Sequence, residues 1–389
     1  MILLLTLLAV SFGLFASYTY FTIRYRKGLK PVPKEKTYPL VSILKPIRHM
    51  DDEIEENLES LFVLDYPRFE ILFAVDAMSD PIVKIIDGLM ARYPYIDAQI
   101  METGHNGIEN PKIHKLALME AEAKGSLFWA NDSNIRAEKD TLKRLVNEYL
   151  ADGARLIFSP IRAVGGRTMG SIIENAYINH FLSGNVISAW KLFKQQIIVG
   201  KSMLVERETL ERFGGFSYFK DYLAEDYMMG ETYTQSKYPI TSHFTWVTTV
   251  NQTTTVAGFF SRMERWAKLR FHLKPHFYIL EVLLNPIMIG LIAGLSLWST
   301  LGAALFAGSL FLKLLLEYLN FFFIDTRDRK RLSIILALPF CIILKDLLLF
   351  AVYFTPFISS TVSWRGGKIS IGKKTLIAMS QESLLYEGA

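Results

Sequence analysis

Hydrophobic residues are concentrated at the two ends of the chain, and a mixed polar and apolar pattern occupies the middle. Residues 2–22 carry no charged side chain, and a helix of roughly 20 apolar residues is long enough to span a bilayer. Because this stretch lacks a basic start and a small-residue cleavage site, it predicts a retained membrane anchor rather than a secretory signal. Three more apolar stretches follow near residues 277–298, 300–324 and 332–357.

The middle of the chain alternates between two periodicities. Runs rich in β-branched and apolar residues predict strands at "YPLVSILKPI", "FEILFAVD", "DAQIMET" and "SLFWAND". Between these runs, Ile54, Leu58 and Leu61 recur at helical spacing, and helices are also expected near 82–93 and 111–124. Strands that alternate with helices predict parallel pairing in an α/β sheet covered by helices on both faces.

These patterns divide the chain into five segments. We expect a transmembrane anchor at 1–24, a globular α/β domain at 36–260, an interfacial helix at 261–275, a membrane region at 276–358 and a cytosolic tail at 359–389.

Basic residues set the expected orientation of these segments. Arg24, Arg26, Lys27 and Lys30 directly follow the first apolar stretch, and positive charge collects on the cytoplasmic side of membranes. The N-terminus is therefore expected outside and the globular domain in the cytosol. This multi-pass arrangement fits a bacterial inner membrane or the membranes of the Golgi and the endoplasmic reticulum.

The last apolar stretch is harder to place. If residues 332–357 crossed the membrane once, the basic tail would be exported against the charge rule. Lys345 and Asp346 would also lie in mid-segment, where each uncompensated charge costs about 2.5–3.5 kcal/mol. We therefore expect a broken or re-entrant hairpin near Pro339 that returns the tail to the cytosol.

Composition supports a membrane-bound globular protein. The chain is 51% hydrophobic, which is high for a soluble enzyme, but 21% charged, which is high for a wholly embedded transporter. The net charge of +5 comes partly from the basic flanks of the apolar stretches. We interpret it as contact with anionic lipid headgroups and not with nucleic acid. The single cysteine, Cys341, cannot form an intrachain disulfide, which agrees with a reducing compartment.

Acidic residues follow two of the predicted strands. Asp76 and Asp80 follow one strand, and Asp132 follows another. Ligands of open α/β sheets bind beyond the carboxyl ends of the strands, so these acids are expected to meet in one crevice. Asp132 could simply form an Asx turn. It could also hold a divalent cation that binds phosphate oxygens.

A second acidic motif lies in "FKDYLAEDYMMGE". Glu225 and Asp226 stand at the expected start of a helix, where a carboxylate often acts only as a cap. The aromatic and apolar neighbours indicate a partly dry pocket. Desolvation would raise the proton affinity of a carboxylate there, which suits a general base.

Cationic residues could complete a phosphate site. Lys112 and Lys115 lie three apart on an expected helix, which is typical of a solvated face but could also balance a diphosphate. Arg262, Arg265 and Trp266 share one face of a later helix because they lie at i, i+3 and i+4. They could anchor the helix at the membrane surface or hold phosphate oxygens in bidentate fashion.

The order of these residues resembles the D, D, D, (Q/R)xxRW pattern of family-2-type glycosyltransferases. More closely, the chain resembles ceramide glucosyltransferases over about residues 40–275, with a further match near 364. The segments that carry the resemblance are "VSILKPI", "NLESLFVLDYP", "NPKI", "DSNIR", "YLAEDYMM", "SRMERWAKLR" and "SWRGGK".

The resemblance implies a GT-A fold (a Rossmann-like mixed sheet), UDP-glucose as donor, a divalent metal ion such as Mn or Mg, and an inverting displacement. Asp132 matches the metal-binding acid, although "DSN" lacks the second acid of a DxD motif, so the metal depends on one protein carboxylate. Asp226 matches the base that deprotonates the primary hydroxyl of ceramide.

The remaining residues match elements around the donor. Asp76 and Asp80 match the nucleoside-side motif, and Lys112 and Glu225 are expected near the nucleotide sugar. The element near the departing UDP and the acceptor corresponds to Arg262, Arg265 and Trp266.

The expected function is therefore glucosylation of ceramide by a membrane-bound enzyme. Two alternatives stay open. The chain could transfer a sugar to another lipid, such as a hopanoid, diacylglycerol or polyprenyl phosphate, because "FKQQIIVGKSMLVER" is less like the ceramide enzymes. It could also be a membrane scaffold that binds nucleotide without catalysis.

Overall fold

The computed structural model describes residues 2–28, 37–48, 50–104, 110–242, 244–364 and 367–378. Lys30 and the end of the predicted tail lie outside these ranges. The chain forms two compact units. We call Lys27–Ile161 with Lys194–Val250 the sheet unit, and Met1–Arg26, Arg162–Phe193 and Asn251–Ala389 the terminal unit. Residues 162–193, which we expected inside the globular domain, therefore pack with the chain ends.

The sheet unit is built on a seven-stranded mixed sheet with the order β3-β2-β1-β4-β8-β6-β9. The first four of these strands pair in parallel, as the alternating pattern predicts, whereas β8 runs antiparallel to β4 and β6. The strands are β1 (Val41–Pro46), β2 (Phe69–Val75), β3 (Asp97–Glu102), β4 (Leu127–Asn131), β6 (Leu156–Phe158), β8 (Ser202–Glu206) and β9 (Ile240–Thr241). A short strand β5 (Ile135–Arg136) pairs with β10 (Val247–Val250) outside this sheet. The α/β class is confirmed.

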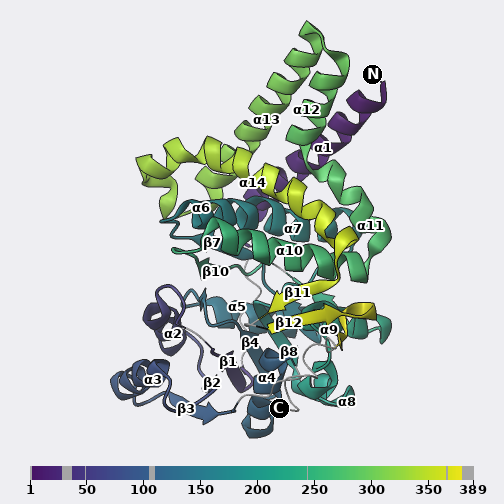
Figure 1. Ribbon diagram of the computed structural model, residues 1–389. Coiled ribbons are helices and arrows are strands. Elements are labelled where there is room, and N and C mark those ends of the chain that lie inside the picture. Colours follow the sequence, from purple (N-terminus) through teal and green to yellow (C-terminus); the bar gives the residue numbers. More distant parts are fainter. Residues whose placement is uncertain are drawn as a thin grey trace, which may run out of the picture. The chain divides into compact units, whose positions relative to one another are not determined.

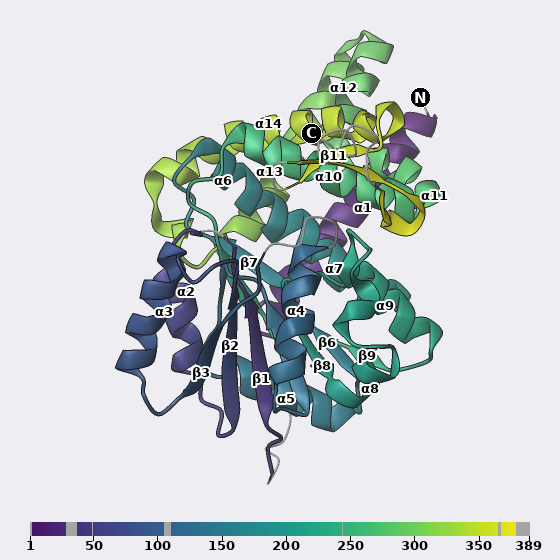
Figure 2. The ribbon, with the colours of Figure 1, turned by 60° about the horizontal axis from the view of Figure 1, so that its bottom comes forward.

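Helices cover the sheet and begin close to where the sequence predicts. Ile54, Leu58 and Leu61 are all buried on α2, and α4 lies against β1 and β2, beside the strands in Figure 2. The central strand β4 is buried along its whole length, as expected for a strand covered on both faces. The helices of the sheet unit are α2 (Ile54–Phe62), α3 (Pro81–Arg92), α4 (Pro111–Glu122), α5 (Thr141–Asp152), α8 (Arg207–Arg212), η2 (Phe216–Phe219) and α9 (Glu225–Gln235).

The terminal unit is mainly helical. The chain passes from the sheet unit to the terminal unit within strand β7 (Ile161–Val164). The following helices are α6 (Met169–Ala176), the π-helical η1 (Tyr177–Leu182), α7 (Ser183–Phe193), α10 (Val256–Leu273), α11 (Pro275–Ile279) and η3 (Leu280–Leu284). Beyond η4 (Asp328–Lys330), the C-terminal part forms a small antiparallel sheet of β11 (Thr361–Trp364), β12 (Gly367–Ile371) and β13 (Ile377–Ala378), with η5 (Lys373–Thr375) before β13.

Three helices of the terminal unit are long and apolar enough to cross a membrane: α1 (Ile2–Tyr25), α13 (Thr300–Ile324) and α14 (Leu332–Ile358). A fourth candidate is the bent pair formed by Pro275–Val282 and α12 (Pro286–Leu297), whose axes differ by 56°. Helices α1, α12 and α13 lie side by side in Figure 1 and contact one another. The apolar segments that the sequence predicts are therefore present as helices.

The expected hairpin at residues 332–357 is wrong. Helix α14 continues from Leu332 to Ile358 through Pro339, and it lies along α10 in Figure 1. The hairpin was expected in order to move Lys345 and Asp346 away from an apolar environment. Instead, Lys345 forms a short ion pair with Glu317 of α13, so the charges are compensated where they lie and the helix does not have to break.

Small residues allow α12 and α13 to approach closely. A Cβ atom built on Gly302 would lie 2.7 Å from the backbone oxygen of Gly294, and one built on Gly290 would lie 2.6 Å from Ser309. Close backbone approach through small residues is typical of helix pairs in membranes.

This contact yields a stability prediction. Gly302→Ala should force the two helices apart and lower the free energy of unfolding in detergent by about 1–3 kcal/mol. Gly308→Ala on the same helix is the matched control, because no atom lies within 4 Å of the added Cβ. Thermal unfolding followed by circular dichroism measures both variants. Equal melting temperatures would contradict the close contact.

Candidate functional site

Lys112 connects three segments of the sheet unit. It lies in the first turn of α4, and its Nζ atom is 2.7 Å from the backbone oxygen of Gly200. The same ammonium group is 3.0 Å from Oδ1 of Asp132 and 3.3 Å from Oε1 of Glu225. Burial lowers the pKa of Lys112, but the carboxylates of Asp132 and Glu225 outweigh burial and raise that pKa above its ordinary value. Lys112 therefore remains charged and holds the two carboxylates together.

Asn110 explains why Lys112 and Glu225 meet. Its side chain caps α4 by accepting a hydrogen bond from the backbone N–H of Lys112 at 3.1 Å, and Pro111 occupies the first helical position. The amide Nδ2 of Asn110 also donates to Oε2 of Glu225 at 3.0 Å. Sequence reasoning missed Asn110, although an Asn–Pro pair before an apolar helix is a recognisable cap signal.

Asp132 lies directly beyond the end of β4, as predicted, and is held between two lysines. Its Oδ1 atom faces Lys112, and its Oδ2 atom is 3.3 Å from Nζ of Lys201. Burial raises the pKa of Asp132, but the two ammonium groups outweigh burial and hold that pKa well below its usual range. Asp132 is therefore ionised, and the ammonium groups of Lys112 and Lys201 balance its negative charge. Lys201 was not predicted as a site residue.

Lys45 supports the same turn from inside the sheet. It is fully buried on β1, and its Nζ atom donates to Oδ1 of Asn131 at 2.6 Å and to the backbone oxygen of Asp132 at 2.5 Å. Burial lowers the pKa of Lys45 to about 7, although the Asp132 carboxylate acts in the opposite direction. These hydrogen bonds fix the backbone from which the Asp132 side chain projects.

Asp226 lies in the first turn of α9, beside the loop that precedes β8. The backbone N–H of Gly200 donates to Oδ2 of Asp226 at 2.7 Å, and the backbone N–H of Tyr227 donates to Oδ1 at 2.7 Å. A Cβ atom on Gly200 would lie 2.8 Å from the Cβ of Asp226, so glycine permits this approach. Burial, and then the neighbouring Glu225 carboxylate, raise the pKa of Asp226 to about 6. Such a group can exchange a proton near neutral pH.

The two remaining acids of the predicted cluster have different environments. Asp76 follows β2, and its Oδ1 atom is 2.7 Å from Nζ of Lys115, a side chain that is 3% exposed. Lys115 is therefore not on a solvated face. Asp80 caps α3 by accepting a hydrogen bond from the N–H of Ile82 at 3.0 Å. Asp76 thus has an ionic partner, whereas the interaction seen for Asp80 among the described residues is its cap of α3.

A metal ion would have few protein ligands here. Among the described residues, no three His, Cys, Asp or Glu side chains group closely enough to hold one. The Nζ atom of Lys201, however, lies between Oδ2 of Asp132 and Oδ1 of Asn134, at 3.3 and 3.0 Å. These two oxygens already bind a cationic group, and Mg²⁺ commonly uses one or two carboxylates together with substrate phosphates. The oxygens of Asp132 and Asn134 therefore fit a divalent ion that replaces the Lys201 ammonium.

The arginine motif belongs to the terminal unit. Arg262, Arg265 and Trp266 all lie on α10, which confirms the predicted helix. Arg262 forms a short ion pair with the buried Glu174, and the Trp266 ring lies 6.2 Å from the ring of Tyr177. These contacts fix part of the motif within its own unit, whereas the acidic cluster belongs to the sheet unit.

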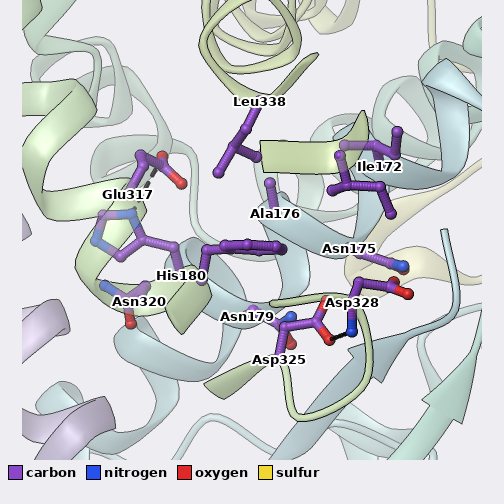
Figure 3. A pocket seen from close by; sticks show the side chains of 12 residues that line it. Ile172, Asn175, Ala176, Asn179, His180, Glu317, Asn320, Asp325, Asp328 and Leu338 are labelled. Carbon is purple, nitrogen blue, oxygen red and sulfur yellow. Dashed lines mark hydrogen bonds and ion pairs between the residues drawn. The ribbon is translucent and has the colours of Figure 1, made fainter. Parts of the chain in front are cut away.

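The terminal unit also contains a polar cavity, shown in Figure 3. His180 of η1 faces Glu317 of α13, with 3.1 Å between Nδ1 and Oε1. Near the end of α13, Asp325 accepts a hydrogen bond from the backbone N–H of Asp328 at 2.7 Å. The side chain of Asp328 in turn accepts two hydrogen bonds, from the N–H groups of Gly165 and Gly166. His180, Asp325 and Asp328 of this cavity are thus paired with a neighbouring side chain or with the backbone.

Comparison with protein families gives a match over almost the whole chain. The model described as Glycosyl transferase family 21 matches residues 4–377. Ceramide glucosyltransferase 3 of Caenorhabditis elegans is 29% identical over 277 residues, which is 70% of this chain and 60% of that protein. Ceramide glucosyltransferase 1 of the same organism is 28% identical over 77% of this chain and 68% of that protein. The matched regions thus span 60% and 68% of the lengths of these two relatives.

A solved structure shares the fold. The mannosyltransferase PcManGT from Pyrobaculum calidifontis, in complex with GDP-Man and Mn2+, superposes with a TM-score of 0.54 at 18% identity. The superposition covers 91% of this chain and 98% of that chain. This likeness supports the GT-A-type fold that the sequence predicts.

The arrangement around Lys112 predicts a pH-dependent loss of stability. Lys112→Met leaves the partly exposed Asp132 and the buried Glu225 without their shared cation, and it should lower the free energy of unfolding at neutral pH by about 1–3 kcal/mol. Lys112 lowers the pKa of both Asp132 and Asp226, so without it the native-state pKa of Asp226 rises further above its unfolded value and the pKa of Asp132 rises from its lowered position. The deficit should therefore shrink as the pH is lowered from about 8 to about 5.

Lys143→Met is the control for this measurement, because Lys143 pairs with the exposed Asp65 at 2.9 Å and an exposed pair of this kind should leave stability almost unchanged. Chemical unfolding of both variants at several pH values gives the comparison. A deficit in Lys112→Met that stays constant with pH would contradict the proposed charge coupling.

Proposed function

Because the chain belongs to glycosyl transferase family 21, we propose that it transfers glucose from UDP-glucose to the primary hydroxyl of ceramide, with inversion at the anomeric carbon. The observation that carries this proposal is the group of Asp132, Glu225 and Asp226 around Lys112 and Gly200. The group lies beyond the carboxyl end of β4, where open α/β sheets bind ligands. The names of the curated relatives support ceramide as acceptor.

Asp226 is the proposed general base. The ceramide hydroxyl attacks the anomeric carbon from the side opposite UDP, its proton passes to a carboxylate oxygen of Asp226, and the bond between the anomeric carbon and the phosphate oxygen breaks. With a pKa of about 6, Asp226 is mostly ionised at neutral pH and still has a raised proton affinity. The N–H groups of Gly200 and Tyr227 hold its carboxylate in place.

Negative charge develops on UDP as its bond to the sugar breaks, and cations already in position stabilise this charge. Such electrostatic stabilisation is usually the largest catalytic effect. In the sheet unit, Lys112 and Lys201 are the proposed cations for the diphosphate. We propose that Arg262, Arg265 and Trp266 contribute from the terminal unit, next to the acceptor. Asp76, Asp80 and Glu225 are proposed to contact the nucleotide sugar, and Asp80 also caps α3.

We further propose that a divalent ion, Mn²⁺ or Mg²⁺, accompanies the donor and is held by Asp132 with the amide oxygen of Asn134. When bound, such an ion neutralises diphosphate charge. Lys201 contacts the same two oxygens, so ammonium and metal compete for them. The Mn2+ in PcManGT supports metal use by this fold.

Membrane attachment follows from the terminal unit. We propose that α1, α12 and α13 enter the bilayer, with the basic loop at 325–331 on the cytosolic side. Helix α14 then lies along the membrane surface, because one of its faces packs on α10 and the opposite face exposes large apolar residues. The exposed stripe on α14 consists of Leu336, Phe340, Leu347, Phe354 and Ile358. In this arrangement the C-terminal tail stays cytosolic, as the charge rule requires.

The base assignment predicts a pH profile and a mutant effect. Asp226→Asn should reduce turnover by about 10²–10⁴-fold, because the amide cannot accept the proton, while UDP binding is nearly unchanged. In the wild-type protein, kcat/KM should rise about tenfold per pH unit up to a pH near 6 and then level off, since only the ionised carboxylate is a base. Transfer of labelled glucose to ceramide, separated by lipid chromatography, measures both effects.

Three results would count against the proposal. Retained turnover in Asp226→Asn would remove its role as base. Transfer to a hopanoid, diacylglycerol or polyprenyl phosphate in place of ceramide would identify a different acceptor. An absence of any transfer, with UDP binding intact, would favour a nucleotide-binding scaffold.

The proposed metal site makes a prediction that does not depend on turnover. With UDP present, binding of Mn²⁺ measured by electron paramagnetic resonance should weaken more than about tenfold in Asp132→Asn, because the charged ligand is lost. Lys201→Met should strengthen Mn²⁺ binding, since it removes the competing ammonium group. Equal affinities in all three proteins would place the metal elsewhere.

A further inference from the structure

Helices α1 and α7 of the terminal unit run side by side in the same direction. A Cβ atom built on Gly184 would lie 2.6 Å from the Cβ of Tyr18, and the Nζ atom of Lys191 lies 4.5 Å from the ring centroid of Tyr25. From the first contact to the second, both helices advance by the same number of residues towards their C-termini. The two helices are therefore parallel, and their last turns lie at the same level.

Helix α13 ends at this level as well. Its Asn320 donates a hydrogen bond to the hydroxyl of Thr19 at 2.9 Å, and further along both helices the guanidinium of Arg26 lies 5.3 Å from the ring centroid of Phe323. These contacts advance together towards the C-termini of α1 and α13, so these two helices are also parallel. Three helices from distant parts of the sequence thus end beside one another in the terminal unit.

The three helix ends carry a group of cationic side chains. We call Arg24 and Arg26 of α1, Lys191 of α7 and Arg329, which follows α13, the basic patch. Arg329 belongs to this patch because its Nη1 atom donates to the backbone oxygen of Phe322, in the last turn of α13, at 3.3 Å. Arg24 and Arg329 are exposed, and Arg26 and Lys191 are partly exposed.

Nearby acids do not neutralise the basic patch. Within the described ranges of the chain, Arg24, Arg26 and Arg329 form no ion pair with a carboxylate, whereas Arg270 elsewhere in the same unit pairs with Glu281 at 2.9 Å. Both aspartates of the loop at 325–331 are buried. Cations at helix C-termini are favourable in themselves, but the patch outweighs the charge of about −0.5 at each of these helix ends. The patch therefore has an excess of positive charge.

Exposed apolar side chains surround the basic patch. Leu192 and Phe193 end α7, Phe322 and Phe323 lie in the last turn of α13, and all four are exposed. Cationic and aromatic side chains at one level are typical of the boundary between a bilayer and water. Because α1 and α13 are also candidate membrane spans, this boundary is where their C-terminal ends are expected.

We propose that the basic patch binds the headgroups of anionic phospholipids, with their phosphates on the cationic groups and their chains against the exposed apolar side chains. This inference rests on the proposed entry of α1 and α13 into the bilayer. Charge complementarity identifies the partner, because a zwitterionic headgroup has no net charge to balance the patch, whereas phosphatidylglycerol has a net negative charge. The guanidinium groups of Arg24, Arg26 and Arg329 also match phosphate oxygens in geometry.

Lipid selectivity tests this inference without any need for turnover. The full chain is reconstituted in phosphatidylcholine vesicles, and electron paramagnetic resonance of spin-labelled lipids measures which lipid is held at the protein surface. For the wild-type protein, the relative association of phosphatidylglycerol should exceed that of phosphatidylcholine at least about fivefold, as expected for one cation near a headgroup. Arg24→Gln combined with Arg26→Gln should lower this preference more than about twofold. Salt at about 1 M should lower it as well, because salt screens exposed charges.

Lys84→Gln combined with Lys373→Gln is the matched control, because it removes the same net charge from two exposed lysines outside the patch. This control should keep the wild-type preference. An equal loss in both double variants would reveal a diffuse effect of net charge and would overturn the inference.

Extraction of the vesicles with alkaline carbonate separates this inference from the proposal on which it rests. Release of the wild-type protein would refute the entry of α1 and α13 into the bilayer, and the inference with it. Wild-type protein that stays embedded but shows no preference for phosphatidylglycerol would overturn the inference alone.

Discussion

The ion pair between Lys112 and Asp132 is the interaction on which the arrangement of the sheet unit depends. The ammonium group of Lys112 connects the start of α4 to the end of β4, to the Gly200 backbone and to Glu225. Gly200 in turn donates to Asp226. Four segments that are distant in sequence thus meet at one charge. Burial, and then the neighbouring Glu225 carboxylate, raise the proton affinity of Asp226, while the ammonium groups of Lys112 and Lys201 keep Asp132 ionised.

Much of this organisation could be predicted from the sequence. The strand and helix pattern located β1, β2, β3, β4 and α4 to within a few residues, because each element has a strong periodicity and a clear boundary residue. The positions of Asp132 and Asp226 at the ends of their elements were also predicted. Each of these positions depends on residues of the same element, so a local sequence pattern is enough to predict it.

Other features depend on contacts that a local pattern does not contain. Lys201 was missed because its role depends on the antiparallel pairing of β8 with β4, which brings it beside Asp132. Residues 162–193 were assigned to the globular domain because nothing in their composition separates them from it. The hairpin at 332–357 was wrong because the partner of Lys345 lies on another helix, at Glu317.

The central claim is that the acids and cations gathered around Lys112 in the sheet unit bind the nucleotide sugar and its diphosphate. The most direct test is a structure of the protein with UDP-glucose and Mn²⁺ bound in lipid nanodiscs. The account predicts that the metal and the diphosphate lie against Asp132, with Asp226 facing the anomeric carbon. A nucleotide sugar bound away from Asp132 and Asp226, or these side chains directed to unrelated surfaces, would contradict it.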